Sequence, residues 1–310
     1  MMTTSDAKWE MEQALFQSCH DGIEAPTTIF ILGAPRTGST YLYQLVIRLF
    51  GLPFISNLTN AYFPTTPIVG LALQHGIDVD ITYKSRYGKT DGPFQPSEGS
   101  GPMIHWFGGG HPSQAVSRTF LDGRSAHFLN SLTVCEVLYG GRPLVIKNAW
   151  NCFRVDCIAA ALPKARFVWI RRDIREAAGS DLEARLKTKG SLSAWNSATP
   201  ANVEALVARP PHEQVVENQY EFSRAIQRSF ETLSTDRWTE LWYEDLLRDP
   251  RVVIDTVGAW LGRESEGEVP DRRTAGMRKT TLPVEAEAIA EYALRESGRL
   301  APFCHGGEVS

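Results

Sequence analysis

The 310-residue sequence lacks an excess of basic residues, and it has no apolar run long enough to cross a membrane. Its 32 Lys and Arg residues are outnumbered by 36 Asp and Glu residues, which gives a net charge of −4. Such a chain has no field that attracts nucleic acid, and a membrane span needs ~18 apolar residues. The N-terminal stretch carries Asp6, Glu10 and Glu12 and has no signal-peptide profile. We therefore expect a cytoplasmic protein with no membrane span and no nucleic-acid partner.

Cysteine is also scarce, with five residues and no Cys-x-x-Cys pair. An odd number in a long chain does not form a disulfide framework, and Cys152 and Cys157 lie within a helical pattern where buried thiols are common. The neighbours Cys19–His20 and Cys304–His305 do not have the spacing of metal ligands. The sequence therefore predicts no metal site. It carries no signal for a particular oligomeric state.

Residues 28–43 combine an apolar stretch, a glycine-rich turn and a helical pattern. Ile29–Leu32 are apolar without alternation, which is typical of a parallel strand buried on both faces. Apolar residues return at helical spacing over Thr40–Phe50. Gly33 and Gly38 allow the turn between them to fold tightly, with its N–H groups at the positive end of the following helix. This P-loop-like strand–loop–helix predicts a site for phosphate.

The loop lacks the lysine of a Walker A motif, although its two glycines have the Walker spacing. Ser39 stands at the lysine position, and Arg36 is the only cation within the loop. A kinase or NTPase would need that lysine and a magnesium-binding aspartate, for which Asp173 is available. A P-loop kinase or NTPase therefore stays open as one alternative. A non-catalytic nucleotide-binding module is the other.

Apolar strands alternate with helical patterns along the rest of the chain. The expected strands are residues 29–32, 143–147, 166–171 and 238–243, and the expected helices are 9–17, 40–50, 69–75, 113–140, 151–162, 177–187, 212–233, 251–261 and 284–296. Residues 92–112 are predicted to form a long irregular loop. This alternation predicts an α/β fold, a three-layer sandwich around a central parallel sheet. We expect one domain over residues 1–310, with an insertion at about 52–140.

Two motifs resemble the sulfotransferases that use 3′-phosphoadenosine 5′-phosphosulfate (PAPS). Residues 35–41, Pro-Arg-Thr-Gly-Ser-Thr-Tyr, resemble the loop that binds the 5′-phosphosulfate. Arg172, with Ser180 eight residues later, is similar to the pair that binds the 3′-phosphate. Tyr243 resembles the family's tyrosine near the adenine. Arg278-Lys279 resembles the pair that folds over the 3′-phosphate, although a threonine follows it in place of the family's glycine.

The resemblance implies transfer of a sulfuryl group from PAPS, in line, to a hydroxyl of a small-molecule, carbohydrate or lipid acceptor. Arg36 would then stabilise the oxygen that leaves with the 5′-phosphate. The implied nucleotide-binding residues are Gly33, Arg36, Thr37, Gly38, Ser39, Thr40, Tyr41, Arg172, Ser180, Tyr243, Arg278 and Lys279.

The general base is the part of the site that the resemblance leaves open. Many family members carry a histidine just after a lysine at a strand end, but Asn148 follows Lys147 here. Lys147 can still contact the sulfuryl oxygens. The base is expected from the irregular segment, where Glu98 and His105 are the two candidates. Histidine has a suitable pKa of ~6.5 unaided, whereas glutamate at ~4.3 would need burial.

Overall fold

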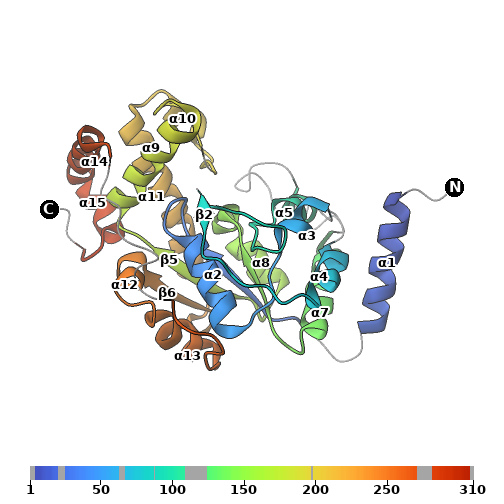
Figure 1. Cartoon of the computed structure of the whole chain (residues 1–310). Helices are drawn as coiled ribbons and strands as arrows, with labels where there is room; N and C mark the ends of the chain where they lie inside the picture. Colours follow the sequence, from blue (N-terminus) through green and yellow to red (C-terminus); the bar gives the residue numbers. More distant parts are fainter. Residues whose placement is uncertain are drawn as a thin grey trace.

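The structure, a computed structural model, describes residues 4–19, 25–62, 67–86, 88–108, 124–196, 198–270 and 281–307. Its centre is a four-stranded sheet in the order β4-β1-β5-β6, and all neighbouring strands are parallel (Figure 1). The strands are β1 (Thr28–Leu32), β4 (Leu144–Lys147), β5 (Arg166–Arg171) and β6 (Trp238–Trp242). Ile31 pairs with Lys147, and Leu32 pairs with Trp169. The expected α/β fold with a central parallel sheet is confirmed.

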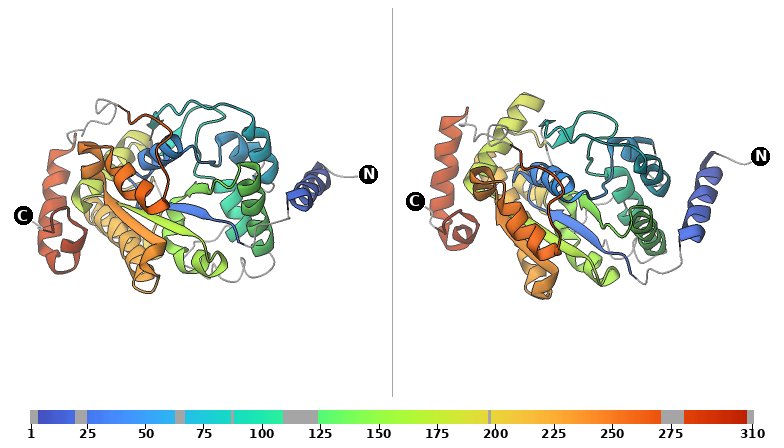
Figure 2. Two further views of the ribbon diagram at one scale, coloured as in Figure 1. Left: turned by 90° about the horizontal axis from the view of Figure 1, so that it is seen from below. Right: turned by 60° about the horizontal axis from the view of Figure 1, so that its bottom comes forward.

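Side chains of the central strand alternate between two hydrophobic cores, one on each face of the sheet. Ile29 and Ile31 pack with α2 (Ser39–Phe50) and with the helical segment formed by η4 (Ile254–Gly258) and α13 (Ala259–Leu261). Phe30 and Leu32 face the other core, which contains residues of α8 (Val155–Ala161), α9 (Ile174–Lys189) and α11 (Pro211–Phe230). Figure 2 shows the sheet between these helical layers. Burial on both faces explains why the strand sequence is continuously apolar.

The segment between β1 and β4 contains more regular structure than the sequence predicts. It forms α3 (Asn57–Tyr62), α4 (Pro67–His75), the short strands β2 (Ser85–Arg86) and β3 (Lys89–Thr90), α5 (Ser100–Phe107) and α7 (Ser125–Leu138). The prediction of a long irregular loop over residues 92–112 is wrong for α5. That helix begins and ends at glycines with positive φ, Gly99 and Gly108, and buries Met103, Trp106 and Phe107. Spacings of three and four residues between these side chains are helical.

Two other parts of the chain differ from the prediction in detail. The expected helix over 151–162 is divided into the 3₁₀ turn η2 (Ala149–Phe153) and α8, because the Asn148 side chain accepts a hydrogen bond from Trp150 N and starts a separate turn. The connection after α9 contains the unexpected α10 (Val203–Val207). Beyond β6 lie α12 (Tyr243–Arg248), α14 (Pro283–Arg295), α15 (Ser297–Leu300) and η6 (Ala301–Phe303). Among the described residues, no helix is both long and apolar enough to span a membrane.

The N-terminal helix α1 (Thr4–Cys19) is attached to the domain by a buried polar contact. Glu12 Oε2 lies 2.5 Å from Nε2 of His127 on α7, and Trp106 Nε1 donates to His127 Nδ1 at 3.0 Å. Glu12 is fully buried. Because His127 Nδ1 accepts from tryptophan, the imidazole donates through Nε2 to the carboxylate. One histidine thus connects α1, α5 and α7.

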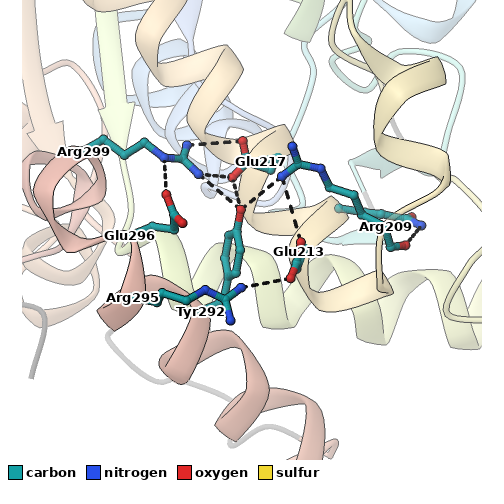
Figure 3. A network of polar contacts seen from close by, with 8 residues as sticks. Arg209, Glu213, Glu217, Tyr292, Arg295, Glu296 and Arg299 are labelled. Atoms are coloured by element: carbon teal, nitrogen blue, oxygen red, sulfur yellow. Dashed lines mark hydrogen bonds and ion pairs between the residues drawn. The ribbon is translucent and has the colours of Figure 1, made fainter.

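A second polar network fixes the C-terminal helices to α11 (Figure 3). Tyr292 Oη donates to Glu217 Oε1 at 2.6 Å, and Arg299 NH1 donates to Glu217 Oε2 at 3.2 Å. Burial, followed by the bond and charge of Glu217, raises the pKa of Tyr292 to about 12. Glu213 lies one turn away and pairs at 3.0 Å with Arg295, which is 63% exposed. The buried Glu217 is therefore the centre of this network.

We predict that Glu217→Ala destabilises the protein by ~3–5 kcal/mol, because it leaves charged and polar partners without their buried acceptor. Glu213→Ala is the matched control and should cost less than ~1 kcal/mol, as expected for a solvent-screened pair. Urea denaturation followed by circular dichroism measures both values. Equal losses in the two variants would contradict the central role of Glu217.

Candidate active site

The loop between β1 and α2 is shaped by two glycines that have no room for a side chain. A Cβ at Gly33 would lie 2.6 Å from Thr37 Oγ1 and 2.9 Å from Ile170 Cγ2. Gly38 has φ +85°, and a Cβ there would lie 2.3 Å from the Tyr243 ring. Thr37 Oγ1 donates to Ala34 O at 2.8 Å and closes the turn. The glycines therefore permit both the fold of the loop and the close approach of Tyr243.

The N-terminus of α2 opens directly from this loop. Gly38 is its N-cap residue and, having no side chain, provides no cap for the first N–H groups of this 12-residue helix. Ser39 and Thr40 begin the helix and add two hydroxyl groups beside those N–H groups. Arg36, inside the loop, has φ +71°, a left-handed conformation that is strained for arginine. The combination of a positive helix end, hydroxyl groups and a cation suits a phosphate or sulfate group.

The second sequence motif lies against the first. Arg172 follows β5 directly, and its NH1 donates to the backbone oxygen of Arg36 at 2.9 Å. Arg36 Nε donates to Ser180 Oγ on α9 at 3.3 Å. The guanidinium of Arg172 also lies 5.0 Å from the centre of the Tyr243 ring. The sequence predicts Arg36 at the 5′-phosphate and Ser180 at the 3′-phosphate of a nucleotide. In this structure the two side chains contact each other.

Asp173, the residue after Arg172, caps the start of α9 and accepts a hydrogen bond from Arg175 N at 2.9 Å. Burial alone would raise its pKa, but bonds from Arg175 and from the backbone N–H of His305 outweigh burial and lower the pKa. Arg175 Nε and NH2 donate to the two carboxylate oxygens at 3.0 and 2.9 Å. Glu244 accepts from Asp173 N at 3.0 Å. Because both oxygens of Asp173 are engaged by Arg175, this carboxylate is poorly suited to magnesium.

A lysine and a carboxylate meet at the end of β4. Lys147 Nζ donates to Glu98 Oε1, and the lysine side chain is 5% exposed while that of the glutamate is 37% exposed. Asn148 Nδ2 donates to the backbone oxygen of Glu98 at 3.1 Å. A Cβ built on Gly88 would lie 3.4 Å from Glu98 Oε1, 3.8 Å from Thr40 Oγ1 and 4.0 Å from Lys147 Nζ. These three polar groups therefore all lie within 4.0 Å of one point.

His105 lies in a different environment. Its ring centre is 5.0 Å from that of His127, and its backbone oxygen accepts from Arg124 NH1 at 2.7 Å. Burial, with smaller effects from His127 and Arg124, lowers the pKa of His105 to about 4. The described contacts thus join Glu98, and not His105, to Lys147. Arg278 and Lys279 lie outside the described residues.

Two supporting residues were not predicted from the sequence. Gln219 on α11 is 2% exposed, and its Nε2 donates to Pro35 O in the loop at 2.8 Å. Cys152 Sγ accepts from Gly33 N at 3.4 Å. A glutamine on the buried face of an amphipathic helix is a detectable signal, because buried amides need partners. Cys152 gave no such signal, since thiols are ordinary core residues.

Comparison with known proteins bears on the family and the fold. A search of curated protein sequences finds no match. Sulfotransferase STF1 from Mycobacterium tuberculosis H37Rv has 15% identity and a TM-score of 0.55, covering 91% of this chain and 80% of that chain. A sulfotransferase from Alicyclobacillus acidocaldarius has 16% identity and a TM-score of 0.49, covering 91% and 96%. The model of the sulfotransferase family matches residues 26–267, so the chain belongs to the sulfotransferase family.

Proposed function

We propose that the protein transfers a sulfuryl group from PAPS to a hydroxyl of a small-molecule, carbohydrate or lipid acceptor. The observation that carries the proposal is the meeting of three groups at one edge of the sheet. These are the residue 33–40 loop, the Arg172/Ser180 pair and the Lys147/Glu98 pair. Transfer in the cytoplasm, without a metal ion or a nucleic-acid partner, belongs to the same proposal.

The nucleotide would bind across the loop and α9. Backbone N–H groups at the start of α2, with Thr37, Ser39 and Thr40, are suited to the 5′-phosphate. Arg172 and Ser180 are suited to the 3′-phosphate, and the ring of Tyr243 to the adenine. Tyr41 belongs to the same proposed nucleotide site. A bound 3′-phosphate would compete with the Arg36–Ser180 contact and so release Arg36 toward the transferred group. Arg278 and Lys279 remain part of the proposed nucleotide site.

Glu98 is the general base that we propose, in preference to His105. The choice rests on position and not on burial, because the Lys147 ammonium group fixes the carboxylate beside the loop while the glutamate side chain is 37% exposed. His105 packs on His127 instead. PAPS supplies the chemistry: the acceptor oxygen bonds to sulfur, the bond from sulfur to the 5′-phosphate oxygen breaks, its electron pair leaves with the phosphate, and Glu98 takes the acceptor proton. Lys147 would balance charge on the sulfuryl oxygens.

The two alternatives have less support. A kinase or NTPase would need a cation at Ser39 and a free Asp173, whose carboxylate is occupied by Arg175. A non-catalytic nucleotide-binding module would not need the buried Lys147 and its glutamate partner. A single-turnover assay with radiolabelled PAPS and pooled alcohols tests the proposal directly. Labelled sulfate esters are expected, whereas binding of adenosine 3′,5′-bisphosphate without transfer would favour the module.

The first prediction concerns the 3′-phosphate. Arg172→Ala should weaken binding of adenosine 3′,5′-bisphosphate by ~1.5–3 kcal/mol, the range for losing a charged hydrogen bond. Adenosine 5′-phosphosulfate, which has no 3′-phosphate, should bind almost as before. Arg171→Ala is a matched control, because that side chain pairs with Glu240 and lies against Trp242. Calorimetry that gave equal losses for both nucleotides in Arg172→Ala would contradict this assignment.

The second prediction separates the two candidate bases. Glu98→Gln should lower turnover by ~10²–10⁴, while the affinity for adenosine 3′,5′-bisphosphate stays nearly constant, because proton transfer matters only in the transition state. His105→Asn should retain most of the activity. Both replacements keep size and polarity, so turnover and calorimetric affinity can be compared directly. Full activity in Glu98→Gln would remove Glu98 as the base.

A further inference from the structure

The residue 33–40 loop contains a tight turn with Arg36 at its third position. Thr37 N donates to Ala34 O at 3.3 Å, so Pro35 and Arg36 are the central residues of a four-residue β-turn. Proline fixes φ at about −65° in the second position, and Arg36 has φ +71° in the third. These signs define a type II turn, whose third position favours glycine. Arg36 therefore has a backbone conformation that its own side chain disfavours.

A type I turn is the alternative that suits arginine better. Its third position has φ of about −90° and accepts most residues. The two turns differ in the orientation of the central peptide, here the one that joins Pro35 to Arg36. The C=O and N–H groups of a trans peptide point in opposite directions, so a flip of this peptide reverses both. A contact that holds Pro35 O thus selects one of the two turns, and with it the direction in which the Arg36 side chain leaves the loop.

Gln219 makes that contact from α11. Its side chain is 2% exposed, and its Nε2 donates to Pro35 O at 2.8 Å. A carbonyl oxygen can only accept, so the amide nitrogen must face it. Within the described part of the chain, Oε1 of Gln219 has no hydrogen-bond partner, so the bond to Pro35 O orients the amide. In a flipped turn this buried donor would lose its acceptor, which is unfavourable.

The peptide on the other side of Arg36 is held as well. Arg172 NH1 donates to Arg36 O at 2.9 Å. The angles φ and ψ of a residue describe its rotation relative to the peptides before and after it. Bonds to Pro35 O and to Arg36 O therefore fix both angles of Arg36. A strained conformation persists where its surroundings over-determine it, and such positions cluster at functional sites.

We propose that Gln219 is a positioning residue for Arg36, because it holds the turn in its type II form. The inference rests on the proposed function, in which Arg36 stabilises the oxygen that leaves with the 5′-phosphate. With Pro35 O bonded to α11, the N–H of Arg36 points away from that helix, and the Arg36 side chain reaches Ser180 on α9. A charge that stabilises a transition state must be held in place beforehand, since small displacements remove much of its effect. Gln219 provides this order without a charge of its own.

The binding test compares Gln219→Met with Gln214→Met. Gln214 is an equally buried amide on α11, but it bonds Arg185 at 2.7 Å and Arg209 O at 2.8 Å and not the loop. Both replacements remove a buried amide, so both should lower the thermal unfolding midpoint. Gln219→Met alone should weaken binding of adenosine 3′,5′-bisphosphate about 10-fold in calorimetry, while its Kd for adenosine 3′-phosphate, which lacks the 5′-phosphate, stays within about twofold of the parent. Equal losses for the two nucleotides, or equal losses in the two variants, would overturn the role of Gln219.

Gln219→Glu adds a measurement that a purely structural role would not affect. The two side chains have the same shape, but an ionised carboxylate repels Pro35 O, whereas a protonated carboxyl can donate to it. Burial raises the pKa of a carboxyl. The loss of bisphosphate affinity relative to the parent should therefore be largest near about pH 8 and should shrink as the pH falls to about 6. A ratio of variant to parent affinity that stays constant with pH would contradict the proposal.

Turnover then connects Gln219 to Arg36. With radiolabelled PAPS and pooled alcohols, Gln219→Met should lower the rate at saturating PAPS at least ~10-fold, and Gln214→Met should keep the parent rate within about twofold. In an Arg36→Ala background, Gln219→Met should lower the rate by less than about twofold, because the group that it positions is gone. The full loss in that background would overturn the inference and leave the proposed function standing. Bisphosphate binding without transfer by the parent would overturn the proposed function, while the comparison of the two nucleotides would still decide whether Gln219 holds the loop.

Discussion

Parallel pairing of β4, β1, β5 and β6 is the constraint on which the site depends. It brings the carboxyl ends of strands that are far apart in the sequence to one edge, so that the residue 33–40 loop, Lys147 and Arg172 become neighbours. The strands β1 and β4 are buried on both faces, and a shift in their register would move core side chains as well as site residues. The positions of the site residues at this edge are therefore fixed by the same packing that forms the hydrophobic cores.

Positive charge at that edge is arranged by contacts within the protein. Arg172 bonds the backbone of the loop, Arg36 bonds Ser180, and Lys147 bonds Glu98. Such pairing keeps several cations close together by giving each an acceptor. The oxygens of an anionic ligand would replace these internal acceptors as partners of the cations. Binding would then move the side chains more than the backbone. Gln219 donates a hydrogen bond to the backbone of the loop and supports it independently of the cations.

The sequence was informative wherever function depends on local backbone. Gly33 and Gly38 have no room for a Cβ, and this requirement is visible as a glycine spacing. The sheet followed from continuous apolar runs, because burial on both faces leaves that pattern. The environments of Glu98 and His105 could not be predicted, since that of His105 depends on how α5 packs against α7 and that of Glu98 on its contacts with the end of β4. Strands of two residues carry no periodicity, so β2 and β3 left no signal.

The contact of His305 with Asp173 has a consequence for biosynthesis. The backbone N–H of His305 donates to Asp173 at 3.1 Å, and Pro302 O accepts from Arg171. Ribosomes add only ~5–20 residues per second, so the loop at residues 33–40 is made many seconds before the segment that completes its surroundings. A nascent chain can therefore form the loop early, but the edge of the sheet around Asp173 acquires its final contacts only after residue 305 has emerged.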